Sequence, residues 1–206
     1  MPRHAFKYSR EFLDELRGKI ESVFDNLEPE RFGQEPKYTS AILGRLHGIE
    51  VRSPHGEYAK IQATDIDDRG RDSAESRYGA DFAITATVGD SQRKVRKVIL
   101  VQVKNHPIDT ISRSQLENLK GQVRKMQRVV SSPKVAGIRR EGGKAMLEVS
   151  SGNKVVKEET FMKSDFPAYF NQRVITTLDG STDQKIVDAL QESNLRKLDV
   201  LIKKNG

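Results

Sequence analysis

Hydrophobic residues recur every three or four positions near the start of the chain, and this period predicts two amphipathic helices. The first is expected over residues 9–27, SREFLDELRGKIESVFDNL, with Ser9 as its N-cap. The second, shorter helix is expected over residues 38–47, just before Gly48. A strand is then predicted at 49–52.

Alternating apolar and polar residues in the middle of the chain predict a β-hairpin. Residues 80–88, ADFAITATV, form its first strand, with Asp81 at the beginning. Turn residues at 89–91 separate this strand from a second one at 95–104, and we expect the two to pair antiparallel. The polar segment 64–77 shows neither the helical period nor the alternation of a strand over most of its length, so we predict a loop there.

The second half of the chain predicts further helices and strands. A helix is expected over residues 114–130, opened by a capping box of Ser114 and Glu117. A last helix is expected to start from a second capping box, Ser181 with Gln184, and to run to about residue 203. Short strands are predicted at 135–139, 145–149 and 154–158. The whole pattern predicts a single α/β unit over residues 1–206, in which helices flank a central mixed β-sheet.

Composition narrows the classes of function. The chain has 206 residues, 32% of them charged, and a net charge of +7, so we expect a folded protein with a charged surface that attracts a polyanion such as nucleic acid. Cysteine is absent, which excludes disulfides, thiolate zinc sites and cysteine nucleophiles. Neither an apolar run of membrane-spanning length nor an apolar secretory segment is present, and we expect a cytoplasmic protein without membrane association.

The stretch VILVQVKNH, residues 98–106, is too apolar for an exposed edge strand and predicts a strand buried on both faces. Because side chains alternate along a strand, Gln102 and Lys104 point to the same side, with Cα atoms about 7 Å apart. The hairpin brings Asp81 next to them. Because a buried lysine requires a partner, we interpret these three residues as a site.

A carboxylate, an amide oxygen and a lysine in one cleft suit the hydrolysis of a phosphodiester. Asp81 and Gln102 can supply oxygen ligands to Mg²⁺ or Mn²⁺ and leave positions open for water and phosphate. Lys104 has two possible roles: its charge can stabilise the phosphate, or, with a lowered pKa, it can orient or deprotonate the attacking water. The sequence leaves both roles open.

A longer pattern surrounds these three residues. The string E-x3-GADF at 75–82, followed by VQVK at 101–104 and L-x2-Q-x3-M at 119–126, resembles the PD-(D/E)XK restriction-endonuclease-like superfamily in its Q-x-K variant, seen in Mrr-type nucleases and in nuclease domains of bacterial anti-phage systems. The resemblance implies a restriction-endonuclease-like core and a Mg²⁺-dependent DNA endonuclease that acts in defence against foreign DNA. It implies metal binding by Asp81 and Gln102, catalysis by Lys104 and a place beside the active site for Gln122.

The sequence departs from the family pattern at three places. Gln102 is neutral where an acidic residue is commoner, which lowers the expected metal affinity. Ala80 stands in the position of the motif proline. The family also tends to supply an upstream acidic residue from its first helix; here residues 38–47 contain none, so Glu75 is expected to act as a further metal ligand. Glu35 and Asp68 are lesser candidates for that place.

Basic residues also surround the apolar stripe of the helix expected at 114–130. The residues that we expect to contact a phosphate backbone are Lys120, Arg124, Lys125 and Arg128. Since no device for reading base sequence is visible, the resemblance also implies control of cleavage by oligomerisation, a regulatory ATPase or a sensor subunit. Two alternatives stay open: a catalytically degenerate nucleic-acid-binding subunit, which the neutral Gln102 favours, and a scaffold protein.

Overall fold

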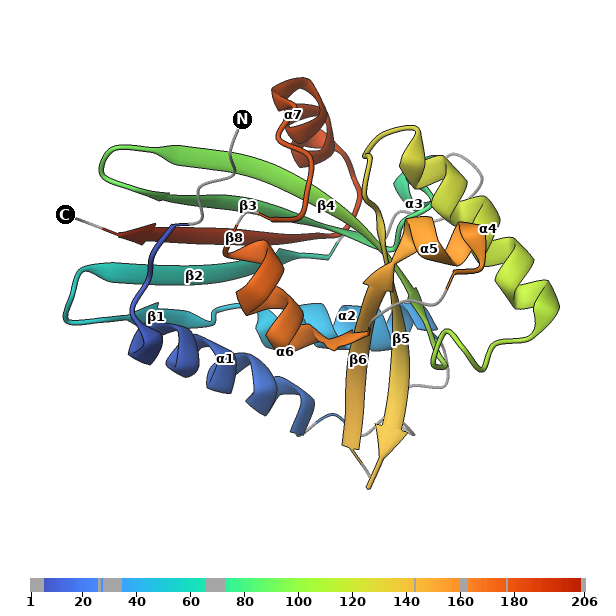
Figure 1. Ribbon diagram of the computed structural model, residues 1–206, viewed down its shortest axis with the longest axis horizontal. Helices are drawn as coiled ribbons and strands as arrows, with labels where there is room; N and C mark the ends of the chain where they lie inside the picture. Colours follow the sequence, from blue (N-terminus) through green and yellow to red (C-terminus); the bar gives the residue numbers. More distant parts are fainter. Residues whose placement is uncertain are drawn as a thin grey trace.

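Helices flank an eight-stranded mixed sheet in the computed structural model, which describes residues 6–25, 27, 35–65, 73–142, 144–159, 163–176 and 178–204 (Figure 1). The strands are β1 (Glu50–Arg52), β2 (Glu57–Thr64), β3 (Phe82–Asp90), β4 (Lys94–Lys104), β5 (Lys134–Glu141), β6 (Lys144–Ser151), β7 (Ser164–Asp165) and β8 (Lys197–Lys204). The helices are α1 (Arg10–Asp25), α2 (Glu35–Leu46), α3 (Ala74–Tyr78), α4 (Arg113–Gln127), α5 (Gly152–Lys157), α6 (Phe166–Tyr169), the π-helical turn η2 (Phe170–Val174) and α7 (Gln184–Glu192).

The order of the strands in the sheet is β1-β2-β8-β3-β4-β5-β6-β7. Two pairs, β3 with β8 and β4 with β5, are parallel, and the other neighbours are antiparallel. Figure 1 shows β5 and β6 turned steeply away from the strands β1 to β4, as the twist of a large sheet requires. The expected α/β class with a central mixed sheet is therefore confirmed.

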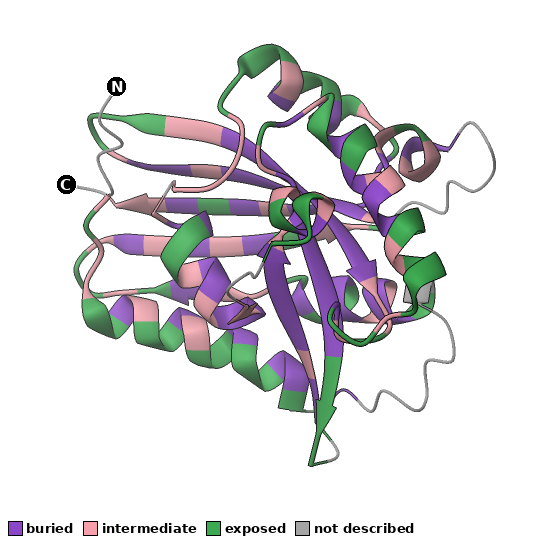
Figure 2. Cartoon of the chain, turned by 45° about the vertical axis from the view of Figure 1, so that its right-hand side comes forward, coloured by how far each residue is buried: buried purple, intermediate pink, exposed green. Residues whose placement is uncertain are grey.

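Apolar side chains on the two faces of the sheet pack against two separate layers of helices. On one face, Ile99 and Val101 of β4 join a core with residues of α1, α2 and α6. On the other, Val98 and Leu100 join a smaller core with residues of α3, α4, α5 and α7. Figure 2 shows buried residues along the strands and a mixture of buried and exposed residues on the helices. The prediction that β4 is buried on both faces is confirmed.

Most of the first half of the chain was predictable from its hydrophobic pattern. The helix α1 begins directly after Ser9, whose Oγ accepts a hydrogen bond from the amide of Phe12 at 3.3 Å, as an N-cap does. The helix α2, the strand β1 and the antiparallel β3–β4 hairpin also lie where they were expected. In the segment predicted as a loop, the described part instead contains the end of β2 and the helix α3.

Three expectations for the second half are wrong. The capping box of α4 is Ser112 with Gln115, two residues before the predicted one. A helix, α5, occupies the place of the strand expected at 154–158. The last predicted helix stops early, because α7 is capped by Asp183 and ends at Glu192, and the following residues form β8. The strand β2 of the first half and the short elements β7, α6 and η2 were not anticipated.

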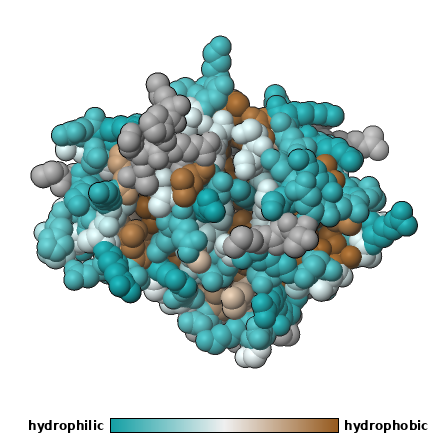
Figure 3. All heavy atoms as spheres, in the orientation of Figure 1, coloured by the Kyte–Doolittle hydropathy of each residue, from teal (hydrophilic) through white to brown (hydrophobic). Residues whose placement is uncertain are grey.

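The surface is as polar as the composition predicts. Figure 3 shows hydrophilic side chains over most of the visible face, with apolar atoms in separate small patches. Among the residues with a described burial, Leu201 is the exposed large hydrophobic side chain, at 38%. Within the described ranges, no helix combines the length and apolar character needed to cross a bilayer.

A buried carboxylate joins the start of α1 to the edge of the sheet. Glu57 of β2 is 1% exposed and accepts hydrogen bonds from the amide and Oγ of Ser9, each at 2.5 Å, and from Oγ of Ser53 at 2.8 Å. Burial raises the pKa of Glu57, but the hydrogen bonds from Ser9 and Ser53 together outweigh it, so this pKa lies below its ordinary value of 4.5. The ionised carboxylate is the form that stabilises the fold.

We predict that Glu57→Gln lowers the free energy of unfolding at neutral pH by about 1–3 kcal/mol, because the amide cannot accept all of these hydrogen bonds. A lowered pKa in the folded state means that the contribution is present above pH 4.5 and is lost as the pH falls through the folded-state value. Urea unfolding at pH 7 and at roughly pH 3 should therefore show a difference between variant and wild type that shrinks in acid.

The control is Glu50→Gln, which changes a partly exposed carboxylate on the neighbouring strand β1. This variant should stay within about 0.5 kcal/mol of the wild type at neutral pH. An equal loss for Glu57→Gln at both pH values would contradict the role given to the ionised form.

Candidate active site

The register of the β3–β4 hairpin brings Asp81 and Gln102 together. Phe82 pairs with Val101, and the amide of Asp81 donates to the carbonyl oxygen of Val101 at 2.9 Å. Two residues further along β4, the amide of Val103 donates to Oδ2 of Asp81 at 2.6 Å. The Asp81 carboxylate thus accepts a hydrogen bond from the β4 backbone just beyond the last backbone–backbone pair of β3 and β4. The predicted proximity of Asp81 and Gln102 is confirmed.

Gln102 is 2% exposed, and its amide is held by two hydrogen bonds. Its Nε2 donates to Oδ2 of Asp81 at 2.5 Å and to the carbonyl oxygen of Val103 at 3.1 Å. Turning the amide to present Oε1 would place that oxygen against the Asp81 carboxylate and the Val103 carbonyl, which is repulsive unless a cation lies between them. The observed arrangement is self-contained, and a metal would have to replace it.

Glu75 reaches the same region from α3, whose N-cap Ser73 accepts a hydrogen bond from the amide of Ser76 at 3.2 Å. Its Oε1 forms an ion pair with Nη1 of Arg196, a residue that is 5% exposed. Nε of Arg196 also pairs with Asp65 at 2.6 Å. Glu75 therefore has the predicted position, but Arg196 already balances its charge.

Gly79 allows α3 to pack directly on α4. It ends α3 in the left-handed conformation, with φ of 71°, and its amide donates to the carbonyl oxygen of Glu75 at 2.8 Å. A Cβ at this position would lie 2.5 Å from the backbone oxygen of Gln122 and 3.0 Å from Cβ of Lys125. Glycine is needed here both for the backbone angle and for the close approach that brings Gln122 beside Asp81.

A polar cleft of about 310 Å³ lies where these elements meet, and we call it the Asp81 cleft. Its lining residues come from α3, the start of β3, β4 and α4: Ser73, Glu75, Ser76, Gly79, Asp81, Gln102, Gln122 and Lys125. Oε1 of Gln122 is buried and has no hydrogen-bond donor among the described residues. A buried oxygen of this kind suits a cation or a water molecule.

Lys104 lies at the end of β4, half-buried, and lines an adjoining cleft of about 570 Å³, the α4 cleft. The other residues that line it all belong to α4: Gln115, Glu117, Asn118, Gly121, Gln122 and Lys125. Gln122 and Lys125 line both clefts. The structure thus brings Asp81, Gln102, Glu75 and Gln122 together, with Lys104 in the cleft next to them.

The basic residues predicted on α4 fall into two groups. Lys120 is 4% exposed and pairs with Glu117 at 2.7 Å and with Glu158, the residue that caps the end of α5, so it is a structural ion-pair residue and not part of an exposed phosphate-binding face. Arg124, Lys125 and Arg128 are exposed, as a face that contacts phosphates requires, and Nζ of Lys125 donates to the carbonyl oxygen of Ser76 at 3.0 Å.

Few side chains of the cleft can serve as metal ligands. In the described part of the chain, no three His, Asp or Glu side chains come together as a metal-binding group. A cation in the Asp81 cleft would use Asp81, Glu75 and the amide oxygens of Gln102 and Gln122, and the unpartnered Oε1 of Gln122 fits such use. Asp68 and the side chain of Glu35 lie outside the described residues.

Two important residues were not found from the sequence. Gly79 belongs to the GAD string, but its role at the end of α3 is not predicted, because α3 lies in a segment expected to be a loop; a glycine after a short helix is a recognisable C-cap signal. Arg196 had no signal at all, because its segment was expected to be helical. Its role depends on β8, which places it beside α3.

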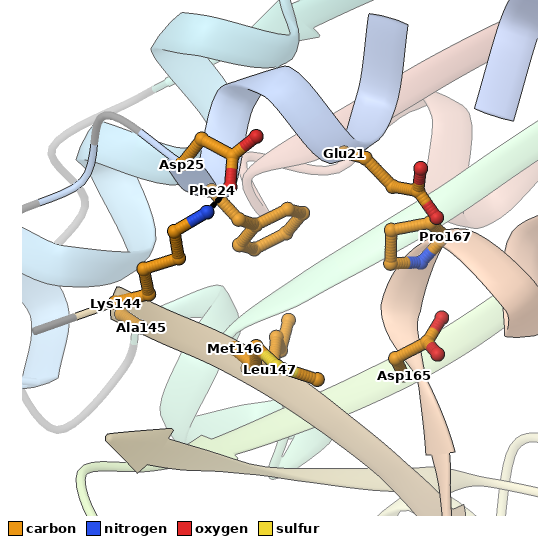
Figure 4. Close-up of a pocket in the computed structure, with 9 residues that line it drawn as sticks. All are labelled: Glu21, Phe24, Asp25, Lys144, Ala145, Met146, Leu147, Asp165 and Pro167. Atoms are coloured by element: carbon orange, nitrogen blue, oxygen red, sulfur yellow. Dashed lines mark hydrogen bonds and ion pairs between the residues drawn. The ribbon is translucent and has the colours of Figure 1, made fainter. Parts of the chain in front are cut away.

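A different pocket, of about 290 Å³, lies between α1 and β6 in the other helical layer (Figure 4). Phe24, Leu147 and Pro167 give it an apolar lining, and an ion pair of 2.6 Å between Lys144 and Asp25 closes one side. Figure 4 shows the ring of Phe24 pointing into this space. The polar groups predicted to act together are all in the opposite layer, so the Asp81 cleft is the candidate active site.

The likeness of this site to a known family rests on its motif residues. Comparisons with models of known protein families, with curated proteins and with solved structures give no match. Membership of the PD-(D/E)XK superfamily therefore stays a prediction, as does a restriction-endonuclease-like core.

We predict that Gly79→Ala lowers the free energy of unfolding by about 1–3 kcal/mol, because the methyl group meets the backbone of α4 and the positive φ is strained. Gly48→Ala is the matched control: its φ is 85°, but no atom lies within 4 Å of the added Cβ. That variant should lose only the strain energy, about 1 kcal/mol. Urea unfolding measures both, and equal losses would contradict the packing role of Gly79.

Proposed function

We propose that the protein is a Mg²⁺- or Mn²⁺-dependent nuclease that hydrolyses phosphodiester bonds of DNA. The observation that carries the proposal is the convergence of Asp81 and Gln102 in a polar cleft, with Glu75 and Gln122 in its walls and Lys104 next to it. These residues belong to the E-x3-GADF, Q-x-K and L-x2-Q-x3-M strings and come from α3, the start of β3, β4 and α4. The net charge of +7 supports a polyanionic substrate.

In this proposal each side chain has a defined task. Asp81 and Gln102, with Glu75, hold the metal ion, and the buried oxygen of Gln122 faces the same space. A bound Mg²⁺ would polarise the phosphate and lower the pKa of a coordinated water molecule. Lys104 and Lys125 bind the phosphate oxygens on the side of the α4 cleft and stabilise the extra negative charge that develops there.

The biological setting follows from the same resemblance. Nuclease domains with this motif belong to bacterial systems that act against foreign DNA, and we propose the same role in the cytoplasm for this chain. Since no element for reading base sequence is recognised, cleavage would be controlled by oligomerisation or by a regulatory ATPase or sensor subunit.

A second candidate function is a nucleic-acid-binding subunit without catalysis. One observation favours it: the candidate ligands are already satisfied within the protein, Asp81 by Gln102 and Val103, and Glu75 by Arg196. Metal binding by the isolated chain separates the two functions.

We predict that the purified protein cleaves DNA in Mg²⁺ or Mn²⁺ but not in EDTA. Asp81→Asn and Lys104→Met should each reduce the cleavage rate by about 100-fold or more, because each removes a charge needed at the reacting phosphate. The assay uses supercoiled, linear and single-stranded DNA. Lys94→Met, an exposed lysine at the other end of β4, is the control and should cleave at the wild-type rate.

Asp81→Asn keeps an oxygen that can accept the hydrogen bond from the amide of Val103, so the fold should be retained, and thermal melting checks this. DNA binding without cleavage by the wild type would favour the second candidate function. If the wild-type protein neither binds nor cleaves DNA, both candidate functions are contradicted.

We further predict that Gln102→Glu makes the protein depend more strongly on metal. Without a divalent ion, two carboxylates would lie within hydrogen-bonding distance, and their repulsion should destabilise the folded protein. Mn²⁺ should relieve this, so its addition should raise the melting temperature of the variant by several degrees, and more than that of the wild type. An equal effect of Mn²⁺ on both proteins would count against a metal site at Gln102.

A further inference from the structure

The middle of α4 contains a glycine that the packing of the helix does not explain. Gly121 lies inside the helix Arg113–Gln127, where glycine is the least favourable residue after proline. A Cβ added at Gly121 would have no atom within 4 Å. Unlike Gly79, therefore, Gly121 is needed neither for a close contact within the protein nor for a positive φ.

Two other helical glycines provide a comparison. Gly18 of α1 and Gly44 of α2 also have no atom within 4 Å of an added Cβ, but both face solvent. Gly121 is half-buried and lines the α4 cleft, together with Lys104 and Gln122. The open space next to its backbone is thus part of a cleft that continues into the candidate active site.

The side chains around Gly121 form a consistent chemical surface. Gln115, Asn118, Gln122 and Lys125 follow each other at intervals of three and four residues, so they share one side of α4. Lys104 adds a second ammonium group from the end of β4. The carboxylate of Glu117 is paired with Lys120 at 2.7 Å, so the cleft presents amide groups and two lysines.

We propose that the α4 cleft binds one nucleic-acid strand, whose sugar-phosphate backbone passes directly over Gly121. Its phosphates contact Lys104 and Lys125, and the amides of Asn118 and Gln122 hydrogen-bond to the strand. Because Gln122 and Lys125 line both clefts, the strand continues into the Asp81 cleft. The continuation of the strand into the Asp81 cleft rests on the proposed nuclease function, whereas binding in the α4 cleft does not.

Substitution of Gly121 tests the proposal, since it adds volume to the cleft without removing any polar group. Gly121→Ala and Gly121→Leu should raise the melting temperature, because both residues favour a helix more than glycine does. Both should weaken binding of a labelled single-stranded DNA oligonucleotide in EDTA, by about tenfold for the larger side chain, through a steric clash. Gly44→Ala and Gly44→Leu are the matched controls, with higher melting temperatures and unchanged binding.

The outcomes separate this proposal from the nuclease function. Unchanged binding by Gly121→Leu, beside a wild type that binds and cleaves, would overturn the α4 cleft and leave the nuclease intact. Weakened binding by Gly121→Leu, with no metal-dependent cleavage by the wild type, would support the cleft and contradict the nuclease. Absence of oligonucleotide binding by the wild type would overturn the cleft whatever the cleavage assay shows. If Gly121→Leu melts below the wild type, Gly121→Ala decides the question.

Discussion

The hydrogen bond from the amide of Val103 to the carboxylate of Asp81 fixes the point at which β3 and β4 separate. There the last residues of β4, from Gln102 to Lys104, keep only their parallel pairing with β5, and the chain that enters β3 comes from α3. The room created by this separation is the Asp81 cleft, and α4 covers it because Gly79 lets the two helices approach. The same carboxylate therefore ends a ladder and lines a site.

The candidate ligands are balanced by neighbours and not left as bare charges. Gln102 donates to Asp81, and Arg196 pairs with Glu75. Burying a charged or polar group costs little only when it is paired in this way. A metal ion that binds here would replace these contacts with metal–ligand bonds. Its affinity would therefore depend on the difference in free energy between the metal-bound protein and the metal-free protein with these contacts intact.

Local patterns were enough to predict the β3–β4 hairpin and the meeting of Asp81 with Gln102, because alternation and pairing within a hairpin are short-range properties. They failed where long-range contacts decide. The segment of β8 follows a capped helix, and the local pattern predicts that the helix continues through it, yet Leu198, Val200 and Ile202 are buried on one face of the sheet and require a strand. Lys120 was expected on the surface, because its partner Glu158 lies 38 residues away in the sequence.

The position of β8 also governs the order in which the chain can fold. This strand, residues 197–204, lies between β2 and β3, which are synthesised more than a hundred residues earlier. Until β8 is in place, β1 and β2 have no strand that pairs them with β3 to β7. Glu75 also lacks its ion-pair partner Arg196. Pairing at such sequence distance is slow to form. A nascent chain that does not yet contain β8 would therefore carry every motif residue and still lack the ion pair that balances Glu75.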